Sequence, residues 1–146
     1  MTNNPGMGAM LHMLFADHSE MAELLDASQG KQIKSLRIDS DYNAGDGGLA
    51  MRFADGSGIW IYDDARSCCE TRYMHTDDYL ASFVGATFRG ARYGEHSETT
   101  KDYETIEIQF VWIDTSLGTF TLETRNEHNG YYGGIVILAK AMEEGE

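Results

Sequence analysis

The chain has little proline, little cysteine and no long apolar run, and each of these shortages argues against a class of protein. It has one proline, Pro5, among 146 residues, which argues against a proline-rich linker or a disordered chain. No run approaches the roughly 18 apolar residues of a membrane helix. The two cysteines, Cys68 and Cys69, are adjacent. Neighbouring strand residues point to opposite faces, so a disulfide between these two would be strained. These cysteines favour a reducing compartment, and the N-terminus lacks the basic region of a signal peptide, so we expect a cytoplasmic protein.

Positive charge is also scarce. Eleven Lys and Arg residues stand against 24 Asp and Glu residues, which gives a net charge of −13. A protein that binds duplex nucleic acid needs a basic face, and an anionic membrane surface would repel this chain. We therefore expect neither a nucleic-acid polymer nor a membrane as partner. Two classes of function stay open: binding of a small anionic ligand that gathers the few arginines, and an acidic mimic of DNA that inhibits a nuclease.

The length fits one domain over residues 1–146. Apolar residues at helical spacing predict a helix over 11–29 that ends before Gly30, or two helices if Asp17 or Ser19 caps a second segment. A sheet core is expected over 30–139, between a loose N-terminus (1–10) and an acidic tail (140–146). The predicted fold class is α+β: an antiparallel β-sheet meander with an N-terminal helix and one short helix after the fourth strand.

Alternating apolar residues mark the strands of this meander. The predicted strands are 33–38, 49–53, 59–62, 68–73, 87–93, 106–112, 119–124 and 135–138. Thr76 or Asp77 is expected to cap the short helix, which ends at Gly85. Residues 94–104 are expected to form a polar loop, and Asn129-Gly130 a tight turn.

Catalytic and metal-binding patterns are not recognised. The histidines (12, 18, 75, 96 and 128) form no HxH or HExxH arrangement and are expected to be surface or partly buried polar groups. Acidic neighbours would raise the pKa of the Cys68 and Cys69 thiols, which argues against a nucleophile, so the Cys68-Cys69-Glu70 run is expected to be structural. The turn at 45–48 lacks the lysine of a phosphate-binding loop. We therefore expect no enzyme, metal or cofactor.

Two segments combine arginines with aromatic or amide side chains. Residues 124–134 contain Arg125, Asn126 and two tyrosines among three glycines, which suits either a phosphate- and base-binding loop or a tight turn with aromatic packing. Residues 88–93 place two arginines between two aromatics. On a regular strand Arg89 and Arg92 would lie on opposite faces unless a bulge at Gly90 intervenes. Ordinary salt bridges to the surrounding acids are the alternative for this pair.

The segments IWIYDDARSCCETRY (59–73) and IEIQFVWIDTSLGTFTLETRNEHNGYYGG (106–134) resemble a domain family common in phages and prophages. The resemblance covers roughly residues 30–139, and it rests on the Cys-Cys-Glu run and the Asn-Gly-Tyr-Tyr turn (129–132). That family includes the first type of Thoeris anti-defence protein. Those proteins bind a cyclic ADP-ribose isomer and hold it intact, and some members also take cyclic oligonucleotides. The resemblance implies antiparallel sheet with short helices, and homo-oligomers (dimers or hexamers) with ligand sites between protomers.

The resemblance predicts a cytoplasmic protein of the host bacterium that sequesters a cyclic nucleotide immune signal without catalysis. Family members often carry an arginine where this chain has Glu123, and Arg125 lies two residues later on the same strand face. Aromatics would stack on adenine, arginines would meet pyrophosphate and amides would read ribose or base. The predicted ligand contacts are Phe88, Arg89, Arg92, Tyr93, Arg125, Asn126, Asn129 and Tyr131. The alternative hypothesis is an acidic DNA mimic that inhibits a host nuclease or a CRISPR effector.

Overall fold

The computed structural model describes residues 19–39, 48–63, 71–128, 135 and 137–142. They form one α-helix, one 3₁₀ turn and strands that pair only in antiparallel fashion. The elements are α2 (Ser19–Ser28), β1 (Ile33–Asp39), β2 (Gly48–Phe53), β3 (Gly58–Asp63), β4 (Thr71–His75), η1 (Leu80–Phe83), β5 (Phe88–Lys101), β6 (Glu104–Thr115), β7 (Gly118–His128) and β8 (Ile137–Ala141).

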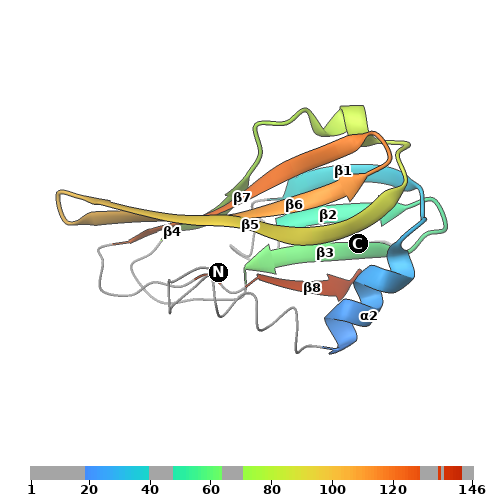
Figure 1. Cartoon of the computed structure of the whole chain (residues 1–146), viewed down its shortest axis with the longest axis horizontal. Coiled ribbons are helices and arrows are strands. Elements are labelled where there is room, and N and C mark those ends of the chain that lie inside the picture. Colours follow the sequence, from blue (N-terminus) through green and yellow to red (C-terminus); the bar gives the residue numbers. More distant parts are fainter. Residues whose placement is uncertain (1–18, 40–47, 64–70, 129–134, 136, 143–146) are drawn as a thin grey trace.

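The strands are divided between two four-stranded sheets, in the orders β1-β2-β3-β8 and β4-β7-β6-β5 (Figure 1). The expected mixture of antiparallel sheet with a helix near the N-terminus is confirmed. The single meander is wrong, because β8 returns to pair with β3 and β4 pairs with β7. These two pairings join strands far apart in the sequence, which local alternation cannot reveal.

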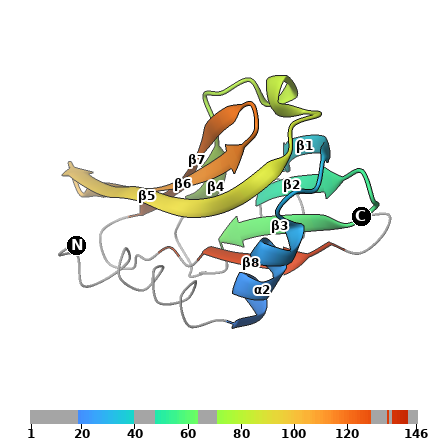
Figure 2. The same cartoon turned by 45° about the vertical axis from the view of Figure 1, so that its right-hand side comes forward.

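One hydrophobic core takes side chains from both sheets and from α2. Leu49 and Ile61 enter it from the first sheet, and Val111 and Leu122 enter it from the second; all four are fully buried. Met21 of α2 is also buried, and its sulfur accepts a hydrogen bond from the backbone of Ala139 in β8. The helix therefore packs against the edge strand β8, as both views show (Figures 1 and 2).

The two sheets are joined at one corner by backbone hydrogen bonds. Residues 30–33 and 85–88 run antiparallel there, with an isolated bridge between Gln32 and Thr87. Ile33 donates to Ala86 and Phe88 donates to Lys31, at 2.8 and 2.9 Å. The Phe88 ring enters the core beside Phe53, with 5.7 Å between ring centroids. This corner fixes where β5 begins and which of its side chains turn inward.

The short helix expected after the fourth strand is only the 3₁₀ turn Leu80–Phe83. Tyr79 and Val84 on either side of it have extended backbone, and Tyr79 makes no side-chain cap bond. Thr76, one of the two expected caps, instead donates its hydroxyl to the backbone oxygen of Thr121, at 2.7 Å. It therefore ties the chain to β7 and does not begin a helix.

The polar loop expected at 94–104 is wrong as well. β5 continues to Lys101 and β6 begins at Glu104, so a hairpin turns at Asp102 and Tyr103, both with positive φ. The hairpin projects beyond the two sheets (Figures 1 and 2). Threonine favours strands, and a two-stranded ribbon in solvent can be polar on both faces. The polar residues of 94–104 therefore indicate a solvent-exposed hairpin and not a loop.

Other boundaries differ by a few residues or lie outside the described residues. Within the predicted helix 11–29, the described part is Ser19–Ser28. The described part of the fourth strand is Thr71–His75, and the last strand begins at Ile137 rather than residue 135. The Cys68-Cys69-Glu70 run and the turn 129–132 lie outside the described residues. Among the described helices, none is long and apolar enough to cross a membrane.

The corner predicts a sharp contrast between two neighbouring residues. Phe88→Ala should lower the free energy of unfolding by about 3–5 kcal/mol, because it leaves a cavity beside Phe53. Arg89 is exposed, so Arg89→Ala should change it by no more than about 0.5 kcal/mol. Urea denaturation of both variants measures the difference. Equal effects would contradict the placement of Phe88 in the core.

Candidate functional site

The outer face of the β4-β7-β6-β5 sheet carries an apolar row on β6. Val111 and Ile113 point into the core and are fully buried. The alternate residues must then point away from the core, and they are partly exposed. This apolar row is Ile106, Ile108, Phe110 and Trp112. A contiguous apolar surface of this kind is typical of binding sites.

Arg92 on β5 and Trp112 on β6 form a stacked pair on this outer face. The two residues are direct cross-strand partners, and the guanidinium carbon lies 4.7 Å from the indole ring centroid. Arg92 Nε and a terminal nitrogen donate to the two carboxylate oxygens of Asp114, at 2.7 and 3.0 Å. Asp114 also accepts a hydrogen bond from Thr119 Oγ1 at 2.7 Å. The orientation of Arg92 is therefore set before any ligand arrives.

The same contacts shift two pKa values. The hydrogen bonds from Arg92, and then that from Thr119, lower the pKa of the Asp114 carboxyl. The carboxylate in turn raises the pKa of Arg92. Both shifts favour the charged forms, so the pair stays ionised at neutral pH. Because both groups are partly exposed, the contribution of this pair to stability is small, and its effect is mainly orientation.

Two irregularities in β5 place these side chains. The register with β6 shifts between Phe88 and Gly90, and again between Tyr93 and His96. The first shift leaves Arg89 without a cross-strand partner between Phe88 and Gly90, at the position where a bulge was expected. The second lies beside Gly94, over which the Trp112 ring packs. A Cβ at Gly94 would lie 2.8 Å from that ring, so only glycine fits there.

A second arginine lies farther along the outer face. Arg125 on β7 donates from Nε and a terminal nitrogen to one oxygen of Glu123, at 2.9 and 2.7 Å. Tyr73 on β4 is the cross-strand partner of Arg125, and its hydroxyl donates to Glu127 at 2.7 Å. That bond raises the pKa of Tyr73. Arg125 is paired with Ile108 and Arg92 with Trp112, so the two arginines are offset by about 13 Å along β6 and by about 10 Å across it.

The inner face of the same sheet holds a buried polar cluster. Its centre is Glu107, 3% exposed, on β6. One carboxylate oxygen lies 2.9 Å from His128 Nε2 and accepts a longer hydrogen bond from Asn126 Nδ2 at 3.4 Å. The other oxygen lies 3.5 Å from His96 Nε2 on β5. A buried carboxylate needs such partners, and these three side chains provide them within the sheet.

The predicted ligand contacts are divided between the two faces. Phe88, Tyr93 and Asn126 point inward: Phe88 and Asn126 are completely buried, and burial raises the pKa of Tyr93 to about 12. Arg92 and Arg125 lie on the outer face, and Arg89 is exposed beside the bulge. The structure therefore does not gather the described members of this set into one site. Asn129 and Tyr131 lie outside the described residues.

Trp112 and Asp114 are the residues of this face that the sequence argument missed. Both lie on β6, outside the two segments chosen for their arginines. The alternation over 106–112 assigned Trp112 to a strand, but its neighbour depends on the register between β5 and β6. The available signal is an aromatic residue and an acid close together on the strand next to the arginines.

Comparisons with known proteins identify a family but no activity. Residues 26–138 match a family model described as a domain of unknown function, DUF7448. Neither the curated proteins nor the solved structures gave a significant match to the chain.

The glycine beneath Trp112 provides a direct test of the stacked pair. Gly94→Ala should displace the indole and lower the free energy of unfolding by about 1–3 kcal/mol, because the new methyl group overlaps the ring. Ser97→Ala, on the same strand in an exposed position, is the control and should stay within about 0.5 kcal/mol. Urea denaturation measures both. An unchanged stability for the Gly94 variant would contradict the packing of Trp112.

The Arg92–Asp114 pair predicts a particular pH dependence. The pKa of Asp114 is lowered in the folded chain, so its contribution is present above the unfolded pKa of about 4 and is lost as the pH falls below it. The indole N–H NMR signal of Trp112 should therefore stay constant from pH 7 to about pH 4 and shift below that. Asp114→Asn should show a displaced signal already at pH 7. A transition centred above pH 5 would argue against this pair.

Proposed function

We propose that this chain, which belongs to the DUF7448 family, is a binding protein that sequesters a small cyclic nucleotide on the outer face of the β4-β7-β6-β5 sheet without a chemical step. The observation that carries the proposal is the Arg92 guanidinium, stacked at 4.7 Å on Trp112 and held by both oxygens of Asp114. This arrangement offers a flat, oriented cation supported by an aromatic ring.

A nucleotide has the two groups that such a pair recognises. Its base is flat and stacks on an aromatic ring or a guanidinium plane, and its phosphate accepts hydrogen bonds from arginine. Asp114 engages Nε and one terminal nitrogen of Arg92, which leaves the second terminal nitrogen to meet a phosphate oxygen. Because Asp114 holds the guanidinium in place, little side-chain entropy is lost on binding.

The distance between the two arginines limits the ligand. Arg125 is offset from Arg92 by about 13 Å along β6 and by about 10 Å across it, with the apolar side chains of Ile108 and Phe110 between them. A mononucleotide is too short to meet both guanidinium groups. A cyclic molecule with more than one nucleotide unit, or a cyclic ADP-ribose isomer held at one end, fits this spacing. The apolar row would cover the sugar and base surfaces between the charged ends.

The surrounding acids favour a small ligand over a polymer. Glu123, Glu127 and Asp114 lie on the same face, and the chain carries a net charge of −13. A long polyanion would meet these carboxylates at every step, whereas a small ligand meets only the two arginines. The same carboxylates are engaged by Arg or Tyr side chains, which gives less support to the DNA mimic, since mimicry needs rows of free acids.

The biological setting follows from the resemblance to anti-defence proteins. We propose that the protein acts in the cytoplasm of a bacterial host and withholds an immune signal made in response to phage. A second copy of the chain would supply further cations to a ligand held between protomers, in a dimer or a hexamer. Sequestration requires that the ligand be bound tightly and released unchanged, and this property separates it from hydrolysis.

Isothermal titration with cyclic ADP-ribose isomers and cyclic trinucleotides tests this proposal. Arg92→Ala and Arg125→Ala should each weaken binding more than about tenfold, equivalent to more than about 1.4 kcal/mol, because each removes a phosphate partner. Arg37→Ala in β1 removes the same charge from the other sheet and should leave the affinity unchanged. Mass spectrometry after release by heat should recover the ligand intact.

Three results would contradict the proposal. Unchanged affinity in both outer-face variants would exclude this face as the site. Recovery of a cleaved product would indicate an enzyme. Absence of binding to every cyclic nucleotide, together with capture of a host nuclease, would favour the acidic inhibitor instead.

A further inference from the structure

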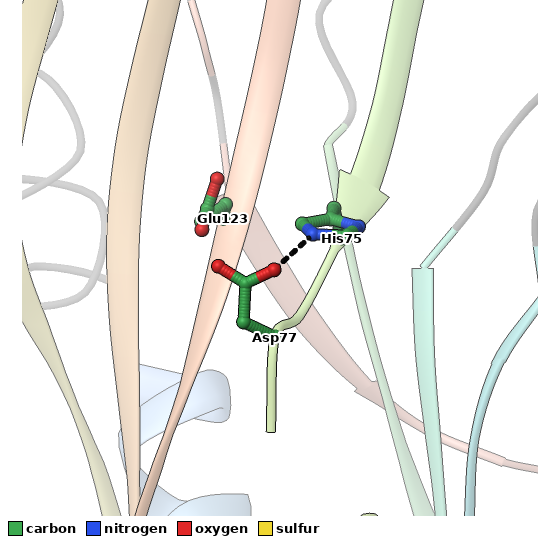
Figure 3. A group of neighbouring side chains, drawn as sticks. All are labelled: His75, Asp77 and Glu123. Carbon is green, nitrogen blue, oxygen red and sulfur yellow. Dashed lines mark hydrogen bonds and ion pairs between the residues drawn. The ribbon is translucent and has the colours of Figure 1, made fainter. Parts of the chain in front are cut away.

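Three side chains capable of binding metal lie together at the end of β4. His75 is the last residue of β4 and pairs in register with Glu123 of β7, and Asp77 follows two residues later. His75 Nε2 lies 2.8 Å from Asp77 Oδ1. One donor atom from each of the three residues lies within 4.8 Å of the other two. Figure 3 shows the Asp77 carboxylate directed at the His75 ring, with Glu123 on its other side.

From this group we propose a binding site for Zn²⁺ formed by His75, Asp77 and Glu123. Zinc binds imidazole nitrogen and carboxylate oxygen at about 2.0–2.2 Å in tetrahedral geometry. Donor atoms around such an ion are therefore separated by about 3.3 Å. The separations within the group extend from 2.8 Å to at most 4.8 Å, so a shift of roughly 1 Å or less per side chain would complete the geometry.

The exposure of the three side chains allows this shift. His75 is 45% exposed and Asp77 is 82% exposed, so both can rotate without disturbing the core. Glu123 is only 12% exposed and is held in place by Arg125. Glu123 therefore gives an ion one fixed ligand on a strand. The two exposed ligands beside it can adjust their positions, and they leave the ion a route from solvent.

Arg125 leaves part of Glu123 available to the metal. Both hydrogen bonds from its guanidinium end on Oε1 of Glu123. The other oxygen, Oε2, is free of this contact and can serve as a single-oxygen ligand. Arg125 would then act as an outer partner that orients a ligating carboxylate, an arrangement that supports many metal sites.

The donor set favours zinc over magnesium or calcium. One imidazole nitrogen with two carboxylates suits zinc, whereas magnesium and calcium prefer oxygen donors alone. Three protein ligands would leave the fourth position open to water or to an anionic ligand. The site lies on the outer face and shares Arg125 with the proposed nucleotide site, as the outer partner of Glu123. None of its three ligands is a proposed nucleotide contact, so zinc binding tests it separately.

The test is isothermal titration of the purified full-length chain with Zn²⁺ alone. Asp77→Asn and His75→Ala should each weaken zinc binding at least about tenfold, because each removes one of three ligands. Glu95→Gln, an exposed residue of β5 outside the group, removes the same charge as the Asp77 variant and should bind zinc as the unaltered chain does. A large excess of Mg²⁺ should not compete. Circular dichroism of each variant confirms that it folds.

Cobalt separates this site from the thiols of Cys68 and Cys69. Co²⁺ bound to nitrogen and oxygen lacks the intense near-ultraviolet charge-transfer bands of cobalt bound to thiolate. We expect a cobalt spectrum without these bands, and we expect it to weaken in Asp77→Asn. Thiolate bands, equal zinc affinity in all four proteins, or no zinc binding at all would each overturn the proposal. Loss of nucleotide binding with zinc binding intact would overturn only the other proposal.

Discussion

The inward orientation of Val111 and Ile113 on β6 is the constraint on which the rest of the second sheet depends. These two fully buried side chains pack with Leu122 and Phe120, their cross-strand partners on β7. Because strand side chains alternate, that choice also buries Glu107 and turns Trp112 outward. A slip of one residue would exchange the two faces, exposing the polar cluster and burying the apolar row. The stacked arginine and the buried carboxylate both follow from this orientation of β6.

The sequence predicts the strands of this sheet better than it predicts their faces. In 106–112 the even-numbered residues are the more apolar, yet Thr105, Glu107 and Gln109 are buried. The pattern of β7 decides which face of β6 is buried. Phe120 and Leu122 are the apolar pair of β7, and antiparallel pairing sets them beside Ile113 and Val111. The face of one strand is therefore settled by its neighbours. Alternation within a single strand can establish that a strand exists, but not which side of it meets the core.

The same reasoning explains which site residues could be predicted. The arginines at 92 and 125 were found by residue type, and they do share the outer face. Phe88 and Asn126 were chosen on the same ground, but the corner with Phe53 and the contact with Glu107 place both inside. His75 and Glu123 lie 48 positions apart, and only the pairing of β4 with β7 brings them together. Residue type suggests which groups can bind, whereas register decides which of them can bind together.

The small number of cations also affects how each arginine is held. In a chain of net charge −13, an arginine free on the surface would fold onto whichever acid lay nearest. Here Asp114 and Glu123 each hold one arginine through a fixed pair of nitrogens, and Trp112 stacks on the first of them. Each acid therefore neutralises charge and at the same time determines the direction in which the remaining N–H groups point. The acids that weaken the attraction for polyanions also give the few cations a defined geometry, and for a small ligand the geometry matters more than the net field.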